Sequence, residues 1–135
     1  MDDYAELEEL NFDILLGKTI TCFIISKDKT HISISCSDGC EYVLYHEQDC
    51  CETVEIYDVC GDIEDILNSP ILLAEKVSSE NKPEDVNLEY EPDSSTWTFY
   101  KLSAINGSIT LRWLGESSGY YSEEVSFAKK NISHE

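Results

Sequence analysis

The dipeptide Asn106-Gly107 is the strongest turn signal in the chain, and it lies between two segments in which apolar and polar residues alternate. A two-residue type I′ turn needs positive φ at both central positions, which Asn and Gly tolerate, so the sequence predicts a β-hairpin over residues 96–114. With these two residues as the loop, Lys101 lies directly opposite Arg112. The hairpin then divides its side chains between two faces.

One face of the predicted hairpin is apolar and is expected to join the core. It carries Ala104, Ile109, Leu102, Leu111, Tyr100 and Trp113. The other face carries Lys101 and Arg112 beside Trp97, Phe99 and Leu114. Because like charges opposed across strands are destabilising, this face favours a shared anion with a flat ring, such as a nucleotide. The alternative is a solvated face whose cations pair with carboxylates on a neighbouring strand.

Arg112 is the only arginine in a chain of formal net charge −19. Its guanidinium is a rigid donor fork suited to phosphate or carboxylate. It is therefore either neutralised by nearby carboxylates or available to an anionic ligand. Nine basic residues against 28 acidic ones argue against a nucleic-acid polymer as partner, because such binding needs many phosphate contacts. An acidic protein could instead imitate DNA and occupy a DNA-binding enzyme.

Length and composition predict one folded domain over residues 1–135. The hydrophobic content of 41% argues against a disordered acidic chain. No apolar run is long enough to span a bilayer, and the acidic N-terminus lacks the features of a signal peptide. We therefore expect a cytoplasmic protein with no membrane partner.

The cysteines are expected to remain reduced, because disulfides are rare in the cytosol. They are Cys22, Cys36, Cys40, Cys50, Cys51 and Cys60. No Cys-x-x-Cys pair is present, and a set made of Cys36, Cys40, His46 and Cys50 has the spacing of no common zinc site. We therefore expect buried free thiols, no metal and no cofactor.

Most of the chain is predicted to form strands. They cover Thr19–Ser26, His31–Cys36, Glu41–Tyr45, Thr53–Val59, Ile71–Val77 and the two arms of the hairpin over 96–114. A second hairpin turns at Asp38-Gly39, and its buried face is expected to carry Ile32, Ile34, Val43 and Tyr45.

The remaining segments complete an α+β fold. Residues 1–16 are an N-terminal helix or arm, and Asp62 caps a helix that Pro70 ends. Residues 78–95 form an acidic loop, and residues 128–135 form a flexible tail. The predicted architecture is a mainly antiparallel sheet of about seven strands with one or two short helices on one side.

Catalytic patterns are weak in this chain. His46 lies near Cys50 and Cys51, but no orienting motif accompanies a Cys–His pair, and a histidine at a strand end is more often structural. Carboxylates are so common that a pair of them carries little information on acid–base catalysis. A glycine-rich phosphate loop is absent. We expect no enzyme and no catalytic residue, with a small hydrolase of nucleotide signals as the lesser alternative.

Several sequence blocks together resemble a family of small phage and prophage proteins. The blocks are Tyr45–Glu52, Gly61–Leu67 with Ser69–Glu75, Thr96–Lys101 and Arg112–Ser122, and together they span about residues 17–127. This family looks like the viral anti-Thoeris sponges, which sequester the cyclic ADP-ribose signals made by bacterial TIR-domain immune proteins.

The resemblance implies non-catalytic binding of a small anionic nucleotide ligand, a cyclic ADP-ribose isomer or a cyclic oligonucleotide, and inhibition of bacterial anti-phage defence. It also implies a homo-oligomer with shared ligand pockets in the host bacterial cytoplasm. The candidate ligand-binding residues are Arg112, Lys101, Phe99, Trp97, Tyr120 and Tyr121. Residues 78–95 have no counterpart in the family pattern. The other alternative is an acidic DNA mimic or protein-interaction inhibitor of a host defence enzyme.

Overall fold

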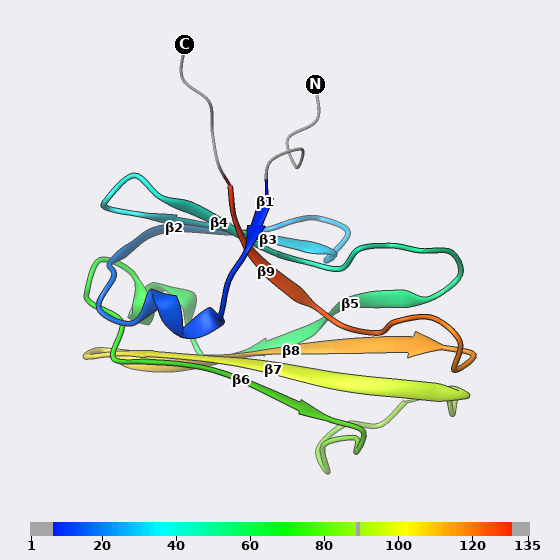
Figure 1. The fold of residues 1–135 in the computed structure, drawn as a ribbon. Coiled ribbons are helices and arrows are strands. Elements are labelled where there is room, and N and C mark those ends of the chain that lie inside the picture. The colour runs from blue at the N-terminus through cyan, green and yellow to red at the C-terminus, as the bar shows by residue number, and fades with distance from the viewer. Residues whose placement is uncertain (1–6, 89, 131–135) are drawn as a thin grey trace.

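The computed structural model describes residues 7–88 and 90–130, which form two antiparallel sheets facing each other (Figure 1). The five-stranded sheet has the order β1-β9-β4-β3-β2, and the four-stranded sheet has the order β5-β8-β7-β6. The elements are β1 (Leu7–Glu9), η1 (Phe12–Leu15), β2 (Ile20–Ile25), β3 (His31–Cys36), β4 (Glu41–Tyr45), β5 (Thr53–Cys60), η2 (Ile63–Ile66), β6 (Leu73–Ser79), β7 (Ser94–Ala104), β8 (Gly107–Ser117) and β9 (Ser126–Lys130).

The mainly antiparallel architecture is confirmed, but the α+β class with a single sheet of about seven strands is wrong. The described residues form nine strands in two sheets, and they contain two 3₁₀ turns but no α-helix. Both predicted helices shorten to one turn. Neither Asn11 nor Asp62 makes a side-chain cap hydrogen bond, and the chain is already extended at Leu67. Segments this short do not sustain an α-helix without such support.

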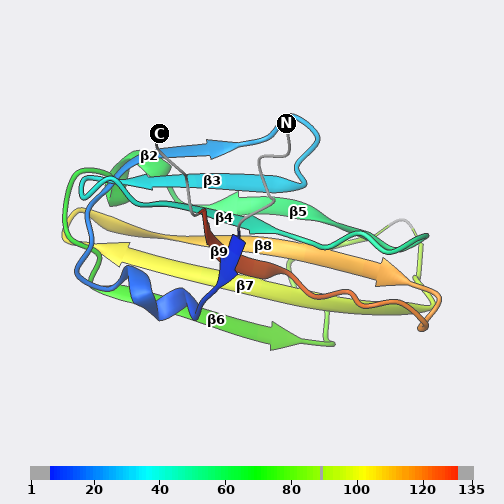
Figure 2. The same cartoon turned by 45° about the horizontal axis from the view of Figure 1, so that its top comes forward.

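The core lies between the two sheets. Its largest fully buried side chains include Trp113, Tyr100 and Tyr42. The turn η1 lies at one side of the molecule, beside β6 (Figure 2). The ring of Phe12, from this turn, is 4.7 Å from that of Tyr100 and 5.2 Å from that of Phe127. One aromatic cluster therefore joins both sheets through η1.

The hairpin of β7 and β8 has the predicted faces but not the predicted pairing. All six expected core residues are buried. The loop, however, is Ile105-Asn106, so Lys101 opposes Thr110 and Arg112 opposes Phe99. Gly107 begins β8 instead of completing the turn. A Cβ atom there would lie 2.8 Å from Asp65 Oδ2, so this glycine allows η2 to approach the strand closely.

The hairpin of β3 and β4 is confirmed, but half of its predicted buried face is wrong. The loop holds three residues, because Cys36 N–H donates to Cys40 O and the strands pair from Ser35 onward. One extra loop residue exchanges the faces of one strand relative to the other. Ile32 therefore lies opposite Leu44, and Ile34 lies opposite Tyr42. All four side chains are part of the main core.

Val43 and Tyr45 point to the outer face of the five-stranded sheet, where they pack with Ala128 and Leu7. These contacts involve both chain ends. Residues 7–9 of the predicted arm pair with β9, and residues 128–130, which the sequence assigns to a tail, are part of that strand. The rest of the arm and tail, residues 1–6 and 131–135, lies outside the described residues. In the part of the chain that is described, no helix has the length and apolar character needed to cross a bilayer.

Candidate functional site

The outer face of the four-stranded sheet is covered by the connection between β6 and β7. The buried side chain of Val86, from this connection, packs against Trp97 of β7 and Leu114 of β8. Tyr57, Leu88 and Phe99 are packed around this second, smaller core. The predicted acidic loop thus lies against the face that carries the predicted ligand-binding residues.

A β-bulge brings an aspartate to this face. The pairing of β5 with β8 shifts between Ile56 and Asp58, so that Asp58 lies directly opposite Arg112. Arg112 donates from Nε to Oδ1 and from Nη2 to Oδ2 of Asp58, both at 2.6 Å. This is a two-pronged, charge-assisted pair, and it matches the alternative in which the arginine is neutralised by a neighbouring strand.

Arg112 also holds the covering connection. Its Nη1 donates to Asp85 Oδ1 at 2.9 Å, and its guanidinium lies 5.8 Å from the centre of the Tyr57 ring. Hydrogen bonds to Asp58 and then Asp85 raise the pKa of Arg112, and the bond from Arg112 lowers the pKa of Asp85. The buried Arg112 of β8 therefore links β5, through Asp58, to the connection between β6 and β7, through Asp85.

A groove of 400 Å³ remains between this segment and the sheet. It is lined by Cys60, Asn81, Pro83, Phe99, Lys101, Thr110 and Arg112. The exposed Lys101 forms no ion pair within 4.0 Å with any described residue, although Glu75 lies opposite it across β6 and β7. The groove therefore combines an aromatic ring, an available ammonium group and a hydroxyl, and its size falls within the ordinary range of small-molecule sites.

Three of the six candidate ligand-binding residues meet in this groove: Arg112, Lys101 and Phe99. Trp97 is fully buried beneath the covering segment, with its ring nearly parallel to Phe99 at 6.2 Å. Tyr120 and Tyr121 contact each other at 5.0 Å and do not line the groove. Tyr120 is 83% exposed.

The candidate ligand-binding residues leave out four residues that line the groove, Cys60, Asn81, Pro83 and Thr110. Cys60 lies opposite Thr110 through the pairing of β5 with β8. That long-range pairing, with its bulge, leaves no local signal in the sequence. Asn81 and Pro83 belong to the segment that the sequence identifies only as an acidic loop.

A larger hollow of 530 Å³ lies between η1, β6 and β9. It has one lysine, Lys76, whose Nζ donates to Val125 O at 3.2 Å and lies 5.8 Å from the centre of the Tyr100 ring. Its acidic lining residues are Glu9, Asp13, Glu75 and Glu124. This charge disfavours an anion, so the groove beside Phe99 is the better candidate for an anionic ligand.

The histidine near the cysteine pair is structural. His46 Nδ1 lies 2.6 Å from Glu124 O, and its Nε2 lies 2.7 Å from Glu52 Oε2. Burial raises the pKa of Glu52, but hydrogen bonds from Cys50, His46 and Asp49 outweigh it and hold the pKa at about 2. Both ring nitrogens of His46 therefore face acceptors, and neither is free to activate a thiol.

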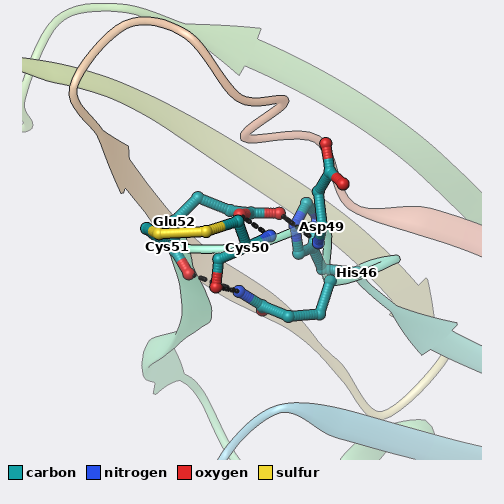
Figure 3. Close-up of a disulfide and its surroundings, with 6 residues drawn as sticks. His46, Asp49, Cys50, Cys51 and Glu52 are labelled. Carbon is teal, nitrogen blue, oxygen red and sulfur yellow. Dashed lines mark hydrogen bonds and ion pairs between the residues drawn. A yellow bond between two sulfur atoms is a disulfide. The ribbon is translucent and has the colours of Figure 1, made fainter.

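The expectation that all six cysteines are buried free thiols is wrong. Cys50 and Cys51 are exposed and joined by a disulfide (Figure 3), while Cys22 and Cys60 are exposed free thiols and Cys36 is buried. Both cysteines lie in the exposed part of the connection between β4 and β5, so they do not pack in the core. Across residues 7–88 and 90–130, no group of three or more His, Cys, Asp or Glu side chains is placed to hold a metal ion.

Residues 13–127 match the model of a protein family described as Domain of unknown function (DUF7448), and the chain belongs to that family. The match covers β2 to β8 and every residue that lines the groove. No curated protein and no solved structure matches the chain.

Proposed function

We propose that this member of the DUF7448 family is a non-catalytic protein that captures a small, ring-bearing anion of the nucleotide type. The supporting observation is the groove that Phe99, Lys101 and Arg112 line together. Phe99 offers a ring on which a base can stack. Lys101 offers a cation without a described carboxylate partner, and Thr110 offers a hydroxyl.

Arg112 has a changed role in this proposal. Its bonds to Asp58 and Asp85 leave one N–H on each terminal nitrogen without an acceptor among the described residues. The arginine therefore forms the wall of the groove and can add a bond to a bound anion, whereas Lys101 supplies the uncompensated charge. Salt screens the more distant acidic residues over about 8–10 Å, so a local cation can hold an anion on an acidic protein.

The resemblance to the anti-Thoeris sponges suggests the ligand class, cyclic ADP-ribose isomers or cyclic oligonucleotides. We propose that the protein sequesters such a signal in the host bacterial cytoplasm and so inhibits anti-phage defence. We also propose that it forms a homo-oligomer, in which the exposed Tyr120 is available to a second subunit.

Lys101→Gln tests the groove directly. We expect it to weaken binding of a cyclic ADP-ribose isomer at least about tenfold, as one charge-assisted contact of this kind predicts. Lys27→Gln is the matched control, because Lys27 is an exposed residue between β2 and β3 of the other sheet. Equal binding by both variants, measured by isothermal titration calorimetry, would place the ligand elsewhere.

A second candidate function is inhibition of a host defence enzyme by DNA mimicry or another acidic interaction. It is favoured by the net charge of −19: the chain has 28 acidic side chains, and the ion pairs between described residues engage four acids, Asp38, Glu52, Asp58 and Asp85. Such a partner would be basic and its binding strongly salt-dependent. Lys101→Gln would leave that binding unchanged.

A further inference from the structure

The connection from β4 to β5, residues 46–52, passes from one sheet to the other. The disulfide between the neighbouring residues Cys50 and Cys51 lies in its exposed part, next to the buried Glu52 (Figure 3). Neither residue lines the groove. The bond therefore belongs to no function proposed so far.

The backbone beside the disulfide is held by one buried carboxylate. Glu52 accepts hydrogen bonds from the N–H of Asp49 at 2.8 Å and from the N–H of Cys50 at 2.9 Å, in addition to His46. Gln48 Nε2 also donates to Glu52 O at 2.6 Å. The disulfide cross-links the two residues that lie between these backbone donors and Glu52, so it belongs to the same turn (Figure 3).

We propose that the Cys50–Cys51 bond is a thiol–disulfide exchange site for small-molecule thiols and that its reduction loosens residues 46–52. A thiolate attacks one of the two sulfurs, the S–S bond breaks, and the departing cysteine sulfur takes up a proton. A second thiolate attacks the resulting mixed disulfide and releases the other cysteine. Two small thiols are thereby oxidised to one disulfide, and the protein carries two cysteine thiols.

Reduction loosens the turn because the cross-link restricts the conformations available to its backbone. With the bond open, the two side chains separate and the N–H groups of Asp49 and Cys50 are no longer confined beside Glu52. The groove beside Phe99 is built by other segments, so it keeps its structure in both states.

The charge around the bond selects the kind of thiol. Glu47 and Asp49 are exposed beside the cysteine pair, and the whole chain is strongly acidic. Repulsion lowers the local concentration of an anionic thiolate, and salt removes the effect. A thiol that carries an ammonium group, such as cysteamine, therefore reduces the bond faster than mercaptoacetate at low salt.

The test begins with the full chain purified without reductant, unfolded and alkylated, and then weighed by mass spectrometry. We expect alkylation of the four free cysteines only, and of all six after treatment with a phosphine reductant. Amide exchange at Asp49 and Cys50 in the native protein should rise by about tenfold on reduction. Six alkylated cysteines without reductant, or unchanged exchange, would overturn the proposal.

Two comparisons complete the test. The double variant Cys50→Ser with Cys51→Ser should exchange like the reduced wild type and not respond to reductant, whereas Cys22→Ser should keep the full response. The rates at which cysteamine and mercaptoacetate reduce the Cys50–Cys51 bond are compared at low and high salt. Each rate is divided by the rate at which the same thiol reduces an uncharged small-molecule disulfide, which corrects for the intrinsic reactivity of the thiol. Equal relative rates at low salt would contradict the selection by charge.

Discussion

Asp58 lies directly opposite Arg112 because Tyr57 forms a bulge between Ile56 and Asp58 in β5. Without the bulge, Tyr57 would oppose Arg112 and Asp58 would point into the core, because side chains alternate along a strand. The bulge thus supplies the carboxylate that neutralises the single arginine, and the arginine in turn holds Asp85 of the covering segment.

Arg112→Lys is expected to release the covering segment. Lysine keeps the charge but cannot form the two-pronged bond to Asp58, so we expect a loss of about 1–3 kcal/mol in the free energy of unfolding. Trp97 lies beneath the segment with no exposed surface, so its quenching by acrylamide should increase. The measurement uses a Trp113→Phe background, in which Trp97 is the only tryptophan.

Asp85→Asn separates the two roles of Arg112. It replaces the charged acceptor with a neutral amide oxygen, which weakens the contact to the segment and leaves the pair with Asp58. Quenching of Trp97 should therefore rise while stability falls less than in Arg112→Lys. Unchanged quenching in both variants would show that the segment is held without the bond between Arg112 and Asp85, by contacts such as those of Val86 and Tyr90.

The connection from β4 to β5 is expected to loosen in acid. The folded-state pKa of Glu52 is about 2, below its ordinary value of 4.5, so its contribution to stability is full above about pH 4.5 and is lost as the pH falls toward 2. In Glu52→Gln this contribution should be missing at neutral pH, and the two proteins should converge in stability near pH 2. Denaturant titrations from pH 7 to 2 measure the difference, and a constant difference would contradict the assignment.

Gly61→Ala is expected to destabilise the protein more than Gly39→Ala. Gly61 and Gly39 have left-handed φ values of 104° and 90°. An alanine in this conformation is strained, so each variant should lose about 1 kcal/mol in the free energy of unfolding. A Cβ atom at Gly61 would also collide with the backbone oxygen of Ser108, whereas Gly39 has nothing within 4 Å of that position. The collision should add about 1–3 kcal/mol. Thermal unfolding of the two variants checks this order, and equal destabilisation would refute the close contact.

A bound ligand should protect Cys60 from alkylation. Cys60 is an exposed free thiol that lines the groove, and Cys22 is an exposed free thiol on the edge strand β2 of the other sheet. A cyclic ADP-ribose isomer at saturation should slow alkylation of Cys60 at least about tenfold, as expected for a site occupied more than nine-tenths of the time. Cys22 should react at an unchanged rate. Equal effects on both thiols, followed by peptide mass spectrometry, would exclude ligand binding in the groove.

Local patterns in the sequence predict most strands and the buried face of the β7–β8 hairpin. They fail where one residue changes the register. Asn106-Gly107 favours a type I′ turn, but the turn lies one residue earlier, at Ile105-Asn106, and Gly107 begins the strand beside Asp65. A three-residue loop turns Val43 to the outer face in the same way.

The sequence also predicts only part of the site, namely the part that depends on local patterns. The sequence places Lys101, Phe99 and Arg112 on one face, because side chains alternate between the two faces along each strand of the hairpin. The neutralising Asp58 and the neighbouring Cys60 come from β5, which pairs with β8 only in the folded chain. No local pattern in the sequence predicts either the bulge in β5 or its pairing with β8.

Capture and release of intact ligand tests the central claim most directly. Purified protein is incubated with cyclic ADP-ribose isomers and with cyclic di- and trinucleotides, and free ligand is measured before and after heat denaturation. The proposed function predicts that one ligand disappears and returns intact, and that Lys101→Gln captures much less of it than Lys27→Gln. Ligand that returns as fragments would identify an enzyme. If no ligand disappears, the nucleotide proposal is wrong, and the acidic surface becomes the site to test with basic protein partners.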